Sequence, residues 1–243
     1  MTKGDVLAKK SIQADRQARV EQMRAAQKAK DRRTTIIVAV AAGAVVVVLI
    51  GLVFVTVRNY RQNNPDQVSL IGVAAADASC DDVETDAATG VNEHVGPGTS
   101  TPDITSVEYD SVPPTHGQHF VQPQFPADPF YTAETRPAIE TLLHNLEHGY
   151  TVVWYSEDLP AEQQDELKAI SDLARDMDET GGKFIVSAWD TAYGELPDDK
   201  QVALSHWGVE SGKRQLCGAV SGAAIEKFVL DNPYTDSPEP DAQ

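Results

Sequence analysis

The segment of residues 140–149 holds the side chains with the clearest chemical potential in this chain. Glu140, His144 and His148 recur every fourth residue, so in a helix they stack on one face, with Glu147 beside them. Neutral imidazole nitrogens and carboxylate oxygens are ligands that Zn²⁺ and Cu²⁺ accept. The same groups also serve as acids and bases. The spacing therefore predicts a metal site or an acid/base site.

A short helix must position these side chains. Pro137 suits the first turn of a helix, and Gly149 can adopt the left-handed conformation that ends one. The apolar side chains between them follow a helical repeat: Ile139, Leu142, Leu143 and Leu146. At the helical rotation per residue, the polar stack is centred about 140° away from this apolar stripe. We therefore expect the histidines to point away from the core.

Further histidines lie outside this helix. His116 and His119 occupy a loop rich in Pro and Gly, and His94 precedes it. We predict a Zn²⁺ or Cu²⁺ site formed by His119, His144 and His148, with His94 or His116 as a fourth ligand. The residues expected to support these ligands are Glu140, Glu147 and Tyr109. The alternative interpretation is a polar network, in which the same side chains hydrogen-bond the loop onto the helix.

The sequence from His144 to His148 also reads H-x-x-E-H, the pattern of inverted zincins. In those metallohydrolases the Glu activates a zinc-bound water, and Glu226 would be a candidate third ligand here. The early helix end at Gly149 and the small size of the domain argue against this interpretation. Nucleotide-binding glycine motifs and the G-x-S-x-G motif are absent from the sequence. We therefore expect a metal-binding protein without catalytic residues, or alternatively a structural or assembly protein of the cell envelope that acts through protein contacts.

Residues 34–57 are uncharged and built almost wholly from Ala, Val, Ile, Leu and Gly. A helix of this length spans the hydrocarbon core of a membrane, which is about 30 Å thick. Residues 1–33 carry ten basic and four acidic side chains, and basic flanks stay on the cytoplasmic side. The apolar region of a cleaved signal peptide is shorter, about 7–15 residues. We predict a single-pass protein of the cell membrane, with a cytoplasmic N-terminus and an extracytoplasmic C-terminal domain.

Charge and cysteine content constrain the external part further. After residue 57 the chain has ten basic and 33 acidic residues, which excludes general binding to nucleic acid. Such a surface suits divalent cations or a basic partner, including another envelope or membrane protein. Cys80 and Cys217 both lie in this part, where disulfides form, so we predict a bond between them. Two free thiols are the alternative.

Composition divides the chain into a basic cytoplasmic segment (1–33), a transmembrane helix (34–57), a linker (58–79), an extracytoplasmic domain (80–234) and a disordered acidic tail (235–243). Within the domain, apolar patterns predict helices that end at Gly149 and cover 161–178 and 221–230. Strands are expected at 150–155, 183–189 and 201–207, with short strands around 104–109. This order predicts an α+β fold, in which a small mixed sheet of at least three strands carries packed helices. Trp154, Trp189 and Trp207 are expected to pack in or near the core.

Two motifs resemble a known bacterial family. The stretch from Tyr109 to His119 reads Y-x3-P-P-x-x-G-x-H, and the stretch from His144 to Gly149 reads H-x-L-E-H-G. Over roughly residues 90–235 the chain resembles the family known as domain of unknown function 3105. The resemblance implies an N-terminal membrane span and an external domain, and it implies no activity. At two positions the chain departs from the family pattern: His116 replaces the more usual Ser and Gln118 the usual Pro.

Overall fold

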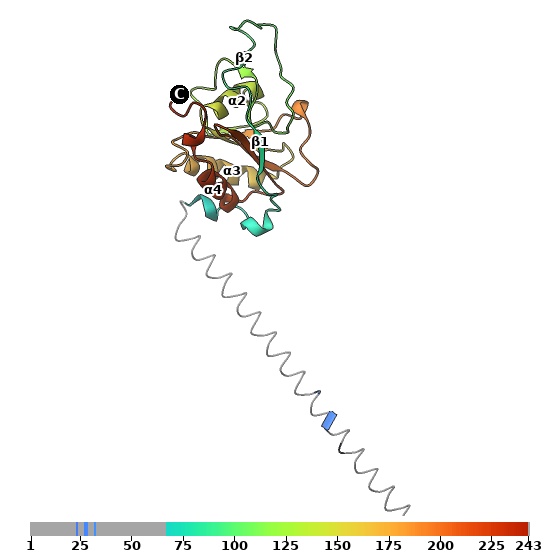
Figure 1. Ribbon diagram of the computed structural model, residues 1–243. Helices are drawn as coiled ribbons and strands as arrows, with labels where there is room; N and C mark the ends of the chain where they lie inside the picture. Colours follow the sequence, from blue (N-terminus) through green and yellow to red (C-terminus); the bar gives the residue numbers. More distant parts are fainter. Residues whose placement is uncertain (1–22, 24–26, 29–31, 33–66, 243) are drawn as a thin grey trace, which may run out of the picture. The chain divides into compact units, whose positions relative to one another are not determined.

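The structure is a computed structural model that describes residues 67–242 together with residues 23, 27, 28 and 32 (Figure 1). The predicted membrane span at 34–57 lies outside the described residues, as does nearly all of the basic segment. Among the residues that are described, no helix combines the length and the hydropathy needed to cross a membrane. The anchor therefore stays a prediction from the sequence.

Six strands form one mixed sheet at the centre of the domain (Figure 1). Their order across the sheet is β1 (Glu84–Ala87), β8 (Ser211–Cys217), β7 (Val202–Trp207), β5 (Thr151–Tyr155), β6 (Phe184–Ala188) and β4 (Phe130–Tyr131). Strands β4 and β5 run parallel to β6, and the other pairs are antiparallel. The central strands β5, β6 and β7 are buried along their whole length. They form the rigid base on which the helices pack.

Helices cover both faces of this sheet. Successive side chains of a strand point to opposite faces, so Trp154 of β5 packs on one side and Val153 on the other. The Trp154 side is covered by α2 (Ile139–Glu147), whose apolar stripe joins the three tryptophans in one core cluster. The Val153 side is covered by α3 (Ala161–Ala174) and α4 (Gly222–Asp231). The helix with the histidines is therefore fixed to the sheet by its leucines.

A second, two-stranded sheet lies against α2. Strand β2 (His94–Val95) pairs in parallel with β3 (His119–Phe120), and β3 contacts α2. In this register His94 lies directly beside His119. A two-residue ladder thus brings together two histidines that are far apart in the sequence.

The predicted α+β class, the three helices and the three central strands are confirmed. The predicted core position of the three tryptophans is confirmed as well, since each is at most 1 % exposed. The sheet is larger than the expected minimum of three strands, because it also contains β1, β4 and β8, which were not predicted. The expected short strands at 104–109 are wrong: this stretch is irregular. The predicted disulfide between Cys80 and Cys217 is present.

Two predicted boundaries differ from the structure. The second half of the linker expected at 58–79 belongs to the domain. It contains η1 (Val68–Leu70) and η2 (Ala75–Asp77), and Val68 is buried in the core. The tail expected to be disordered is ordered to residue 242. It begins with η4 (Tyr234–Asp236) and hydrogen-bonds to the rest of the domain. A further short helix, η3 (Thr191–Tyr193), follows β6.

Gly222→Ala is expected to lower the free energy of unfolding by about 1–3 kcal/mol, because the new Cβ would overlap the backbone carbonyl of Val68. Gly222 opens α4, and the overlap would push η1 off that helix. Urea unfolding followed by tryptophan fluorescence measures the change. An unchanged midpoint would show that η1 does not dock on α4 in solution.

Candidate metal centre

Helix α2 and the β2–β3 ladder together bring three histidines to one place. The ring centroids of His94, His119 and His144 are separated by 4.8–4.9 Å. Glu147, one turn beyond His144 on α2, reaches the same point. One potential ligand atom from each of these four residues lies within 4.8 Å of the others. Three imidazoles and one carboxylate therefore form a compact group.

Backbone carbonyls fix the orientation of two of these rings. The Nδ1–H of His119 donates to the Gly117 carbonyl at 2.8 Å, and that of His144 donates to the Phe120 carbonyl at 2.6 Å. A carbonyl can only accept, so Nδ1 carries the proton on each neutral ring. Each Nε2 is then left with its lone pair. Metal-binding histidines are commonly oriented in this way by a hydrogen bond from the opposite nitrogen.

Three atoms of the group are buried without a hydrogen bond of normal geometry: Nε2 of His94, Nε2 of His119 and Oε2 of Glu147. The His119 and Glu147 atoms are 3.0 Å apart, and His94 Nε2 is 3.9 Å from the same carboxylate oxygen. A lone pair on His119 Nε2 would be repelled by the carboxylate at this distance unless a positive charge, either a proton on Nε2 or a bound cation, lies between the two atoms. Since buried polar atoms are normally satisfied, these atoms fit a bound cation.

The protonation states suit a cation as well. Burial lowers the pKa of His144 to about 4, and it also lowers the pKa of His94. Burial alone would raise the pKa of Glu147, but His119 and the Asn92 N–H, which donates to Oε1 at 2.6 Å, lower it overall. At neutral pH His94 and His144 therefore offer neutral imidazoles and Glu147 an ionised carboxylate, the forms that bind metal.

A second group adjoins the first. Glu147, His148 and Glu239 also place potential ligand atoms within 4.8 Å of one another. His148 Nε2 is 3.0 Å from His144 Nε2 and 3.5 Å from Glu239 Oε2. Glu239 was missed from the sequence because it lies in an acidic, Pro-containing tail that resembles a disordered segment. Only the fold brings it to the end of α2.

Comparison with known proteins shows to which family the chain belongs. The family described as "Protein of unknown function (DUF3105)" matches residues 101–243, more than half of the chain. The chain belongs to the DUF3105 family. No curated protein and no solved structure matches it. Within this DUF3105 chain, His119, His144 and Glu147 lie inside the matched region, whereas His94 lies before it.

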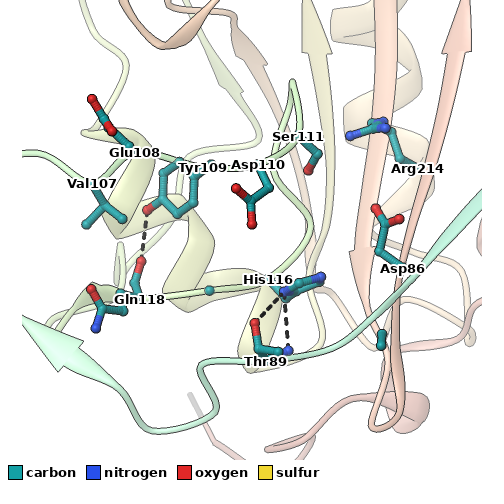
Figure 2. Close-up of a pocket in the computed structure, with 12 residues that line it drawn as sticks. Asp86, Thr89, Val107, Glu108, Tyr109, Asp110, Ser111, His116, Gln118 and Arg214 are labelled. Carbon is teal, nitrogen blue, oxygen red and sulfur yellow. Dashed lines mark hydrogen bonds between the residues drawn. The ribbon is translucent and has the colours of Figure 1, made fainter.

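His116, a predicted ligand of the DUF3105 domain, is not part of either group. Its Nδ1 accepts from the Thr89 N–H at 3.3 Å and lies 3.2 Å from the Thr89 hydroxyl. The ring lines a cavity of about 540 Å³ together with Tyr109 and Arg214, which Figure 2 also labels. His116 thus lines a cavity apart from the two groups of potential ligands.

Glu140 and Tyr109, predicted to support the ligands, attach the loop that carries His119. Both carboxylate oxygens of Glu140 accept from the Tyr193 hydroxyl at 2.9 Å, and one also accepts from the Val107 N–H. The Tyr109 hydroxyl donates to the Gln118 carbonyl at 2.9 Å (Figure 2). This part of the DUF3105 domain is the polar network that the alternative interpretation describes. It adjoins the candidate metal group.

The histidine face of α2 is buried, although it points away from the leucine stripe. Glu140 and Glu147 are fully buried, and His144 and His148 are almost so. The leucine stripe does face the sheet, as the helical repeat predicts. The opposite face of α2 is covered by β2, β3 and the C-terminal tail. Glu226, the third ligand of a zincin-like site, lies on α4, which packs on the other face of the sheet.

Proposed function

We propose that this DUF3105 domain binds a transition metal ion, Zn²⁺ or Cu²⁺, through His94, His119, His144 and Glu147. One observation carries the proposal: Nε2 of His94, Nε2 of His119 and Oε2 of Glu147 converge in a buried space without hydrogen bonds of normal geometry. Imidazole nitrogens and a carboxylate are the donors that both ions accept. Neither cysteine competes as a ligand, because the two form the disulfide.

The proposed role is binding and not catalysis. Four protein ligands fill a tetrahedral zinc site, whereas catalytic zinc sites keep one position open for water or substrate. Glu147 lies within the ligand group and contacts His119, which suits a ligand better than the general base of a zincin. The proposal is therefore a module that holds or hands on a metal.

We also propose that the module works outside the cytoplasm and is anchored by the segment at 34–57. The first support is the uncharged run of residues, which follows a basic segment. The second is the disulfide, a kind of bond that persists mainly outside the cytoplasm. An extracytoplasmic site exchanges metal with the surroundings of the cell. Its protein partner, if metal is handed on, would be another envelope protein.

The test compares the metal content of the wild-type chain with that of His119→Ala/His144→Ala. Each protein is purified in mild detergent without a histidine tag, incubated with ZnCl₂ or CuCl₂, dialysed and analysed by elemental mass spectrometry. We expect the wild type to retain at least one ion per chain after dialysis, held by the four proposed ligands. The affinity of the double variant should fall by more than about 100-fold, since loss of an outer-shell partner alone costs about 10–100-fold.

His116→Ala is the matched control, because it removes a histidine of the same loop that lies outside both groups. It should bind metal as the wild type does. If the wild type binds neither ion, or if the double variant binds as tightly as the wild type, the proposal is wrong. The histidines would then act as a scaffold for the loop. That outcome would favour the alternative of an envelope assembly protein that acts through protein contacts.

A further inference from the structure

The C-terminal tail lies over the solvent side of the candidate metal centre and brings one carboxylate with it. The Glu239 N–H donates to the Glu147 carbonyl at 3.0 Å, which ties the tail to the last turn of α2. The Glu239 side chain is 33 % exposed, whereas that of His148 is 8 % exposed. Glu239 therefore stands between the buried histidines and solvent.

Lys183 anchors the tail on the far side of Glu239. Its Nζ donates to the carbonyls of Pro240 and Ala242, at 2.7 Å each, and to the His148 carbonyl at 2.8 Å. One ammonium group thus joins two tail residues to the end of α2. These hydrogen bonds hold the backbone of the tail on both sides of Glu239, so this residue is fixed beside the end of α2.

The atoms that face one another here form a donor set for a cation. Glu147 and Glu239 place carboxylate oxygens within 4.8 Å of each other and of a His148 ring nitrogen. Two carboxylates at this separation repel each other unless a positive charge lies between them. The Lys183 ammonium does not fill that role, because its hydrogen bonds go to backbone carbonyls. The buried Oε2 of Glu147 also makes no hydrogen bond of normal geometry.

We propose a second, outer cation site formed by Glu147, His148 and Glu239, which takes a divalent ion such as Zn²⁺. It shares Glu147 with the inner group and so rests on the proposed function. Because Glu239 is partly exposed, the outer ion exchanges with solvent more readily than the inner one. The docked tail completes the site, since it supplies the only ligand that does not come from α2.

The experiment counts the Zn²⁺ ions bound by the full-length chain in detergent. The protein is titrated with ZnCl₂ in competition with a zinc indicator dye. We expect two ions in the wild type, a tighter and a weaker one, and one ion in Glu239→Gln, which has lost the weaker. The substitution keeps the size of the side chain and leaves the backbone contacts of the tail in place.

Asp241→Asn is the matched control, because it removes the same charge from the same tail outside both groups. It should bind two ions. One ion in the wild type, or two ions in Glu239→Gln, would overturn the outer site and leave the inner site standing. No ion in the wild type would overturn both. Loss of an ion in Asp241→Asn as well would show that tail charge alone matters, and this too would overturn the outer site.

Discussion

Replacement of both cysteines by serine is expected to lower the free energy of unfolding by about 2–5 kcal/mol. Cys80 and Cys217 are 137 residues apart in the sequence, so the bond closes almost the whole domain into one loop. In the chain-entropy account, a loop of this length restricts the unfolded state by about 5 kcal/mol at most. The effect should therefore be among the largest available from any pair of side chains.

The folded state itself should change little in this variant. Hydrogen bonds from the Asp81 N–H to the Leu216 carbonyl and from the Gly218 N–H to the Ala78 carbonyl, both 2.8 Å, hold the two segments together beside the disulfide. Urea unfolding followed by tryptophan fluorescence, with a chelator present, measures the loss without a contribution from metal. The wild type treated with a reductant should match the double variant. A loss below about 1 kcal/mol would contradict the entropic account.

His206→Leu is expected to make the domain more resistant to acid. His206 lies in β7, is fully buried, and makes no hydrogen bond of normal geometry through either ring nitrogen. Burial lowers its pKa to about 4; Lys213 adds to this effect, and the backbone of Asp236 opposes it. Replacing an unsatisfied buried ring by an apolar side chain should raise stability by about 1 kcal/mol at pH 7.

The direction of the pH effect depends on whether the folded or the unfolded state takes up the proton. An unfolded histidine takes up a proton below about pH 6.5, whereas folded His206 stays neutral until about pH 4. Between these values the unfolded state holds more protons, so wild-type stability falls as the pH falls. The contribution of this one ring is on the order of 3 kcal/mol. The advantage of His206→Leu should therefore grow as the pH is lowered from 7 to 4.

His206→Asn separates titration from polarity, because it cannot take up a proton in this range but keeps a buried polar group. It should lose the same part of the pH dependence as His206→Leu without the gain at pH 7. Urea unfolding at several pH values, with a chelator present, gives both quantities. Equal pH dependence in the wild type and in both variants would show that His206 does not titrate as its burial requires.

The strands that were found from the sequence and those that were missed differ in one physical respect. Strand β5 is apolar on both faces, so its residues identify it without reference to any other part of the chain. In β8 the run Lys213–Gln215 is polar and half-buried, and β1 is exposed throughout. Pairing with a neighbour holds these strands in the sheet. That information is not local, so no pattern within either segment reveals it.

The same limit applies to the site. The helical repeat singled out His144 and His148 as candidate ligands, with Glu147 in a supporting role, and showed which face of α2 meets the sheet. It could not show that residues from two distant loops and from the tail would bury the other face. His119 and His94 were candidates by residue type, and their side-by-side register came only with the β2–β3 ladder. His116 was an equal candidate by type, yet it lies elsewhere.

The position of the candidate ligands along α2 also bears on the charge of what can bind. His144, Glu147 and His148 occupy the last turn and the cap of this helix. Aligned peptide dipoles leave partial negative charge at that end, which favours a cation by about 0.3–1 kcal/mol and disfavours an anion. A phosphate or carboxylate substrate would approach against this field. The backbone of α2 thus selects for positive charge before any side chain is considered.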